Sequence, residues 1–121
     1  MNVLEQRSRP NMVLNVTISK KTGCGNLYTT VTYDEDGALE VFAKLGHVGD
    51  CSRSLLEALT RCISQGLRYG VPLDIYIKQL KGIRCKNAIN FPKKYAVSSC
   101  SDALGKSLEQ FNDVYQKMEE K

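Results

Sequence analysis

The most constraining feature of this sequence is a change in the spacing of its apolar residues near residue 50. Before that point, the residues alternate between two sides of an extended chain in three segments, at 12–19, 27–33 and 38–45. The connections between these strands are too short for crossovers, so the strands form an antiparallel meander. The more apolar side of the middle strand is expected to face the core, and it carries Leu27, Thr29, Val31 and Tyr33.

After residue 50, apolar residues recur every three or four positions, which is typical of one face of a helix. This spacing predicts helices over Ser52–Arg68, over Pro72–Gly82 and along a stripe from Leu104 to Met118, with a loop at 83–98. The expected fold is α+β, with a three-stranded antiparallel meander followed by three helices packed on one face. The element order is β-β-β-α-α-loop-α. Residues 11–121 are expected to form a single domain after a flexible N-terminus at 1–10.

The sequence predicts a cytoplasmic protein without membrane contact. No apolar run approaches the roughly 20 residues that span a bilayer. The first residues, "MNVLEQRSRPN", carry charges where a signal peptide needs an apolar stretch. Because disulfides are disfavoured in a reducing compartment, the five cysteines are candidates for metal ligation, redox chemistry or simple burial.

The five cysteines fall into two groups. Cys62 lies within the apolar stripe of the first helix, so we expect it to be buried as a small hydrophobic residue. The others lie at element boundaries next to glycine, serine or basic residues, and they are Cys24, Cys51, Cys85 and Cys100. Four boundary thiols are compatible with a tetrahedral zinc site, although no C-x₂-C knuckle is present. They are equally compatible with free thiols.

A second candidate site is the loop "GHVGDCSRS", which runs into the first helix. Free N–H groups at a helix start favour an anion, and an acid-free stretch from Ile75 to Ser101 could supply positive charge. The candidate ligand-binding residues are Gly46, His47, Gly49, Ser52, Arg53, Lys81, Arg84 and Lys86. Such a site would bind a nucleotide or another phosphate ligand. Asp50 is equally readable as the N-cap of this helix, which is a purely structural role.

Two further alternatives have less support. Cys51 and His47 could form a thiol nucleophile with its base, but no group that would orient the histidine is identifiable. Tyr76, Phe91 and Tyr95 are interleaved with lysines and could stack on bases, but a net charge of +4 is low for a nucleic-acid-binding protein.

Four motifs give the chain a resemblance to a known family: "TGCGNLY", "GHVGDC" before a helix, "LKGIRC", and "SCSD" before the last helix. Together they resemble the TSCPD domain, the C-terminal domain of adenosylcobalamin-dependent (class II) ribonucleotide reductases. The resemblance runs from about Arg9 to Leu108. It implies that Cys24, Cys51, Cys85 and Cys100 correspond to the recurring cysteines of the family and bind zinc.

Two positions depart from the family pattern. Ser101 replaces the motif proline and could supply a hydroxyl as N-cap of the last helix. His47 lies where a lysine or another polar residue is expected, so no role is carried over to it.

The resemblance implies an accessory module and not an enzyme. A chain of 121 residues cannot hold the large barrel and corrin site of a reductase, and no C-x-x-C dithiol lies near its C-terminus. The expected partners are a nucleotide ligand or another protein, with nucleic acid unlikely as a partner. Because a three-stranded sheet leaves edges that a second copy could cover, we also predict a homo-oligomer.

Overall fold

The computed structural model describes residues 5–46 and 49–119, and it has the predicted element order. The strands are β1 (Leu14–Thr22), β2 (Gly25–Asp34) and β3 (Gly37–Leu45). The helices are α1 (Asp50–Arg68), α2 (Leu73–Leu80) and α3 (Cys100–Glu119), and a 3-10 turn, η1 (Lys93–Tyr95), lies in the loop before α3. The α+β prediction is therefore confirmed.

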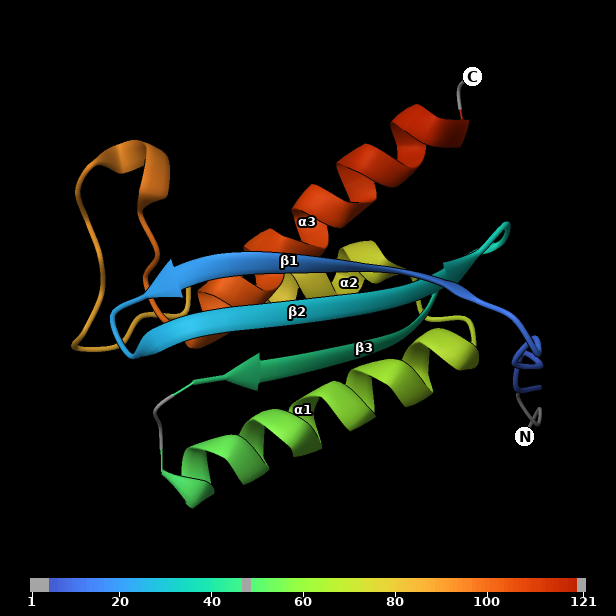
Figure 1. Cartoon of the computed structure of the whole chain (residues 1–121), viewed down its shortest axis with the longest axis horizontal. Helices are drawn as coiled ribbons and strands as arrows, with labels where there is room; N and C mark the ends of the chain where they lie inside the picture. Colours follow the sequence, from blue (N-terminus) through green and yellow to red (C-terminus); the bar gives the residue numbers. More distant parts are fainter. Residues whose placement is uncertain (1–4, 47–48, 120–121) are drawn as a thin grey trace.

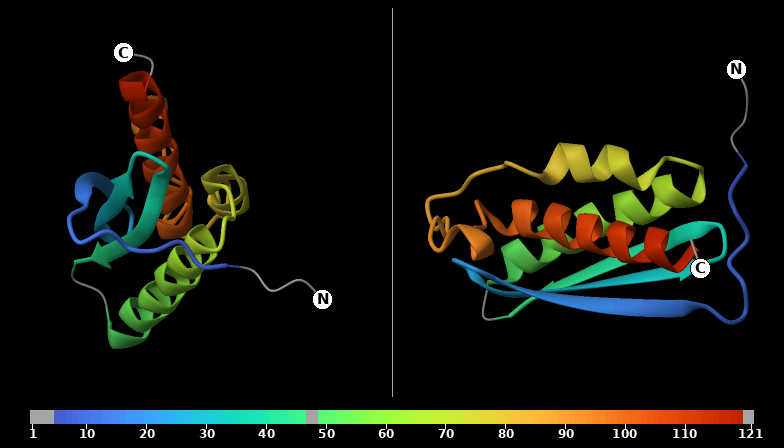
Figure 2. Two further views of the ribbon diagram at one scale, coloured as in Figure 1. Left: turned by 90° about the vertical axis from the view of Figure 1, so that its right-hand side faces the viewer. Right: turned by 90° about the horizontal axis from the view of Figure 1, so that it is seen from above.

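The three strands form one antiparallel sheet in the order β1-β2-β3. All three helices lie on the same side of the sheet, but in two layers (Figures 1 and 2). Helix α3 packs against β1 and β2, and α1 runs along β3. Helix α2 packs against α3 and lies farther from the sheet. The core fills the space between the sheet and the helices.

The predicted inner side of β2 is confirmed. Leu27, Thr29 and Val31 are fully buried, and Tyr33 packs against the core. Opposite them, Leu104 and Leu108 of α3 are also fully buried. Burial of this apolar surface is the main favourable contribution to folding, because it removes the side chains from water.

Two close contacts explain how α2 fits over the other helices. A Cβ at Gly66 of α1 would lie 1.8 Å from the Tyr76 hydroxyl of α2. A Cβ at Gly105 of α3 would lie 3.0 Å from Leu80 and Lys81. Glycine at both positions lets the helices approach more closely than any side chain would allow.

The apolar stripe of α1 is narrower than the sequence predicts. The buried residues of this helix are Thr60, Ile63 and Leu67, whereas Cys62 is exposed and Leu55 is 72% exposed. The prediction that Cys62 is buried is therefore wrong. Since α1 lies along the edge strand β3, only one narrow face of the helix meets the protein.

The N-terminal segment has specific contacts with the domain. The Arg7 N–H donates to the Arg68 carbonyl, 2.7 Å away, and the Arg7 guanidinium pairs with Asp34 at 2.8 Å. Arg9 pairs with Glu40 at 2.6 Å. Flexibility of residues 1–10 remains a prediction from the sequence.

No helix within the described residues is both long and apolar enough to cross a bilayer.

Candidate functional site

Three of the four boundary cysteines come together at one end of the sheet. Cys24 lies in the two-residue turn between β1 and β2, Cys85 lies in the loop after α2, and Cys100 is the first residue of α3. The Thr22 hydroxyl contacts both the Cys24 N–H and the Cys100 sulfur, and the loop that carries Cys85 reaches the Cys24 sulfur through Asn87, so the three thiols lie near one another. We call Cys24, Cys85 and Cys100 the thiol cluster. All three are half-buried.

The β1–β2 turn is fitted closely against the loop that carries Cys85. A Cβ at Gly23 would lie 1.6 Å from the Asn87 carbonyl oxygen, so only glycine allows this contact. The Asn87 side-chain amide donates to the Cys24 sulfur at 3.5 Å. The lack of a side chain at Gly23 and the hydrogen bond from Asn87 therefore hold Cys24 next to a segment that lies more than 60 residues further along the chain.

Thr22 links the turn to the start of α3. Its side chain is buried, and its hydroxyl donates to the Gly25 carbonyl at 2.7 Å and accepts the Cys24 N–H at 3.1 Å. The same oxygen lies 3.6 Å from the Cys100 sulfur. One buried hydroxyl thus fixes both the turn and its distance to Cys100.

The thiols of Cys24 and Cys100 have opposite pKa shifts. The hydrogen bond from Asn87 lowers the pKa of Cys24, and hydrogen bonds with Cys100 and Cys85 lower it further against the effect of burial. Burial raises the pKa of Cys100, and the nearby charges of Cys24 and Cys85 raise it further, while Thr22 acts in the opposite direction. Cys24 is therefore the more acidic of the two and ionises first.

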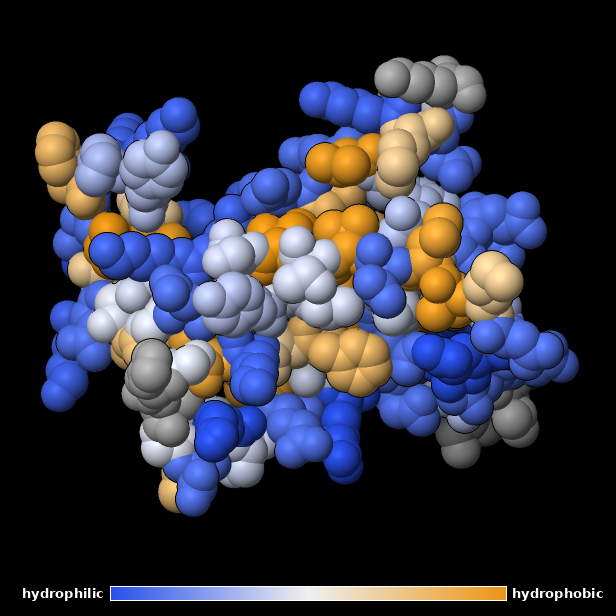
Figure 3. All heavy atoms as spheres, viewed as in Figure 1, coloured by the Kyte–Doolittle hydropathy of each residue, from blue (hydrophilic) through white to orange (hydrophobic). Residues whose placement is uncertain are grey.

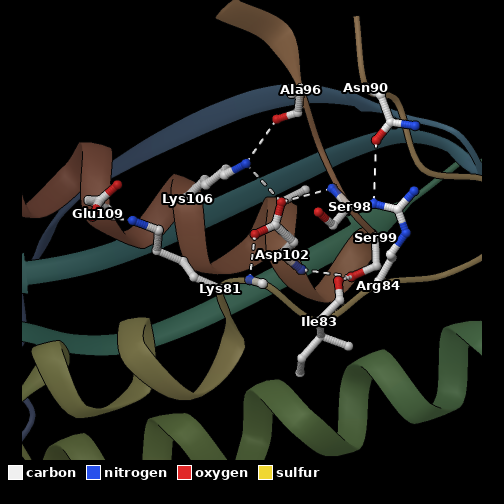
Figure 4. A network of polar contacts seen from close by, with 12 residues as sticks. Lys81, Ile83, Arg84, Asn90, Ala96, Ser98, Ser99, Asp102, Lys106 and Glu109 are labelled. Atoms are coloured by element: carbon white, nitrogen blue, oxygen red, sulfur yellow. Dashed lines mark hydrogen bonds and ion pairs between the residues drawn. The ribbon is translucent and has the colours of Figure 1, made fainter. Parts of the chain in front are cut away.

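Asp102 holds the segments around Cys85 and Cys100 together (Figure 4). Its side chain is only 2% exposed, and its carboxylate accepts the Gly82 N–H at 2.8 Å and the Ser98 N–H at 2.9 Å. The Lys106 ammonium lies 2.9 Å away and also donates to the Ala96 carbonyl. The carboxylate thus joins the end of α2, the loop before α3 and α3 itself.

The pKa of Asp102 reflects these contacts. Burial acts to raise it, but the hydrogen bonds from Gly82 and Ser98 and the charge of Lys106 outweigh that effect and lower the pKa. Asp102 is therefore a buried carboxylate whose ionised form is fully supported by its partners. The "SCSD" motif contains this residue, but the sequence did not reveal its role.

The N-caps of α1 and α3 differ from those predicted. Ser99, and not Ser101, caps α3: its hydroxyl accepts the Asp102 N–H at 3.0 Å and donates to the Ile83 carbonyl. Gly49 precedes α1, and no side chain of the described residues bonds to the cap position. Asp50 is the first residue of α1 and is not its N-cap. Both cap predictions are therefore wrong.

Cys51 is separate from the thiol cluster in this structure. It is exposed in the first turn of α1, and it is not among the groups that affect the pKa of Cys24 or Cys100. The loop before it does begin beside the β1–β2 turn, since the Gly46 N–H donates to the Asn26 carbonyl at 3.2 Å. His47 lies outside the described residues.

The described residues do not form a complete metal-binding shell. No group of three or more His, Cys, Asp or Glu side chains within 5–46 and 49–119 is arranged to hold a metal ion. The thiol cluster supplies the right donor atoms, because zinc in structural sites prefers thiolate sulfur. Its chemistry therefore fits zinc, although the three thiols as described are not arranged to hold a metal ion.

The predicted ligand-binding residues that the structure describes lie in different surroundings, and whether they bind a ligand stays a prediction. Arg53 lines a hollow of about 300 Å³ between β3 and α1, together with Lys44 and Leu56, and no residue of the basic stretch lines it. Lys81 is instead paired with Glu109 at 2.7 Å, and the Arg84 guanidinium donates to Asn90. Gly49, Ser52 and Lys86 are exposed, and Gly46 is half-buried.

These features define a small α+β domain with a cluster of three thiols where its first turn, its long loop and its last helix meet. The TSCPD domain family matches residues 5–112, and the chain belongs to this family. The resemblance seen in the four motifs is therefore confirmed.

Two curated relatives are vitamin B12-dependent ribonucleotide reductases, from Streptantibioticus cattleyicolor and Streptomyces clavuligerus. Each is 30% identical to this chain over 82 residues. The alignment covers 68% of this chain but only 13% and 8% of the two relatives, respectively. The similarity is thus to a small part of those reductases. No solved structure matches the chain significantly.

Proposed function

We propose that this protein is a non-catalytic accessory domain stabilised by a zinc ion bound to Cys24, Cys85, Cys100 and Cys51. The convergence of three thiols from three distant segments carries this proposal. Zinc bound to four thiolates is a structural cofactor, because it leaves no open position for substrate or water. The metal would contribute directly to folding, since its ligands come from segments that meet only in the native state.

Cys51 is proposed as the fourth ligand because of its place in the chain. It follows Gly46 by only five residues, and Gly46 lies beside the turn that carries Cys24. No described side chain caps the first turn of α1, so a shift of this turn breaks no cap among the described residues. His47, in the same loop, is the competing donor.

Metal analysis tests this proposal. Protein purified without added zinc is expected to contain about one zinc per chain, as in other four-thiolate structural sites. Cys24→Ser, Cys85→Ser and Cys100→Ser should each lose most of it. The matched control is Cys62→Ser, which should retain the metal because Cys62 is exposed on α1. A fully folded wild-type protein without bound metal would overturn the proposal.

The same measurement identifies the fourth ligand. Loss of zinc in Cys51→Ser but not in His47→Ala supports the four-cysteine site. The reverse result would replace Cys51 by His47 and leave the rest of the site intact.

A second candidate function is the binding of a phosphate-containing ligand at the start of α1. The observation in its favour is that Arg53 and Lys44 line a hollow beside a helix start that no described side chain caps. Thermal denaturation with nucleoside phosphates, including cyclic and deoxy forms, tests this function. The expected result is a stabilisation that Arg53→Ala abolishes and Lys78→Ala, on α2, does not. No stabilisation by any of these ligands would exclude the site.

A further inference from the structure

Strand β1 has one edge without a partner. It is an outer strand of the sheet, and no other described segment bonds to its backbone from the free side. Thr22 and Gly25 flank a two-residue turn and form a hydrogen-bonded pair. By the alternation of an antiparallel ladder, every second residue then directs its N–H and C=O away from β2, and these residues are Asn15, Thr17, Ser19 and Lys21.

The opposite edge of the sheet is protected. Helix α1 runs along β3, and the Ser64 hydroxyl accepts the Val41 N–H at 2.9 Å and donates to the Val41 carbonyl at 3.0 Å. The Arg7 guanidinium donates to the Ala38 carbonyl at 3.1 Å. Natural proteins usually cover or interrupt the edges of sheets, because an open edge can pair with another chain. The exposed edge of β1 is therefore the exception in this fold.

Helix α3 extends beyond the β1 edge on the inner side of the sheet (Figures 1 and 2). Its last turns carry the half-exposed side chains of Val114 and Met118. Leu14, the first residue of β1, and Met12, two residues before it, are 62% and 86% exposed. Apolar side chains gather along this border between β1 and α3 (Figure 3). An added strand beside β1 would have one of its faces covered by this apolar surface.

The two ends of the β1 edge carry opposite charges. A hollow of about 490 Å³ at the C-terminal end is lined by Lys20, Lys21 and Lys94. A hollow of about 510 Å³ at the other end is lined by the acidic residues Asp34, Glu35 and Glu119, of which Asp34 is paired with Arg7. These charges favour an occupant that is acidic at the first end and basic at the second.

We propose that the β1 edge binds one extended peptide segment of a partner protein as a fourth, antiparallel strand. Main-chain hydrogen bonds to β1 supply affinity, and alternate apolar side chains of the peptide pack against Val114 and Met118. Carboxylates at its N-terminal end lie beside Lys20 and Lys21. A second copy of this chain is the competing occupant of this edge, and the oligomeric state tests it. This inference does not depend on zinc.

The probe is a fluorescein-labelled peptide, Asp-Glu-Val-Thr-Val-Thr-Val-Lys-Lys, measured by fluorescence anisotropy against the full chain. The matched peptide has serine in place of each valine and the same charges. We expect saturable binding of the first peptide, and binding of the second to be weaker by about tenfold because the apolar contacts are lost. No binding of the valine peptide, or equal binding of both, would overturn the proposal.

Variants of the protein locate the binding site. Ser19→Pro removes one outward N–H of β1 without removing a bond to β2, and should weaken binding about tenfold. The double variant Lys21→Glu/Lys94→Glu should weaken peptide binding without any change in the backbone of β1. The control Lys78→Glu, on α2, should leave peptide binding unchanged. The charge variants remain informative even if Ser19→Pro does not fold. Binding that none of these variants affects would place the peptide elsewhere and overturn the proposal.

The oligomeric state gives an independent test. Sedimentation of the unliganded chain should show a monomer with an available β1 edge. A dimer that Ser19→Pro dissociates would show that a second copy occupies the edge, and would overturn the peptide assignment in favour of the predicted homo-oligomer. Zinc content measured on the same samples separates failure of this inference from failure of the metal site.

Discussion

Helices α1 and α3 both begin with a cysteine in the first turn, but the two helix starts are built differently. At α3, Ser99 caps the helix, and the buried carboxylate of Asp102 binds two N–H groups from segments outside it. At α1, Gly49 precedes the helix and no described side chain caps it. Cys100 therefore lies in a structure fixed by several bonds, whereas Cys51 lies at an exposed helix start that no side chain of the described residues caps.

This difference shows how the domain positions its thiols. The network around Asp102 brings the segments of Cys85 and Cys100 together, so hydrogen bonds and an ion pair within the chain fix these two segments relative to each other. Among the described residues, the start of α1 has no comparable network. A ligand at this helix start, either an anion or a metal shared with the thiol cluster, would supply contacts that no described side chain makes there.

The largest expected effect comes from removing the carboxylate at the start of α3. Asp102→Ala leaves the Lys106 charge and two N–H groups without their partner, and should lower the free energy of unfolding by about 3 kcal/mol. Urea denaturation measures the change. Asp113→Ala, on an exposed position of the same helix, is the control and should have little effect. Similar stability of both variants would show that the network does not hold α3 in place.

A smaller effect is expected at the turn that carries Cys24. In Gly23→Ala, the new methyl group would overlap the Asn87 carbonyl oxygen, so the turn and the loop must separate. We expect a loss of about 1–3 kcal/mol, the usual cost of overpacking. The separation should also lower zinc content. The control is Gly46→Ala, since a Cβ at Gly46 meets no atom within 4 Å. Equal stability and metal content in the two variants would contradict the close fit.

The smallest effect is expected from a substitution that gives the start of α1 a side-chain cap, as α3 already has. Gly49 has the extended backbone of an N-cap, with φ −69° and ψ 165°, so Gly49→Asp can cap the helix without strain. Aspartate is a slightly better N-cap than glycine, and we expect a gain of a few tenths of a kcal/mol. Thermal denaturation measures it, with Ser52→Asp as a control for charge alone. An equal gain in both variants would mean that charge near the helix start, and not capping, is responsible.

Parts of the candidate site could be predicted from the sequence. The boundary positions of Cys24, Cys85 and Cys100 distinguish these residues from Cys62, because their neighbours break the apolar periodicity. The same reasoning failed for the burial of Cys62. An apolar stripe predicts which face of a helix turns inward, but not how much of that face the neighbouring elements cover.

The role of Asp102 was not predictable from local pattern. A single aspartate near a helix start is usually an exposed residue that interacts with the helix dipole. Here it is buried because the end of α2 and the loop before α3 both direct N–H groups at it. Those segments are 20 and 4 residues away along the chain, and only the folded chain brings them together.

The sequence alone determined the type and order of the helices and strands, the antiparallel meander and the family motifs. These features depend on the spacing of neighbouring residues and on the lengths of connections, which are local properties of the chain. The tertiary structure decided which thiols meet, which face of α1 is buried, how α3 is capped and which sheet edge is open. These properties depend on contacts between distant residues, and such contacts exist only after the chain has packed.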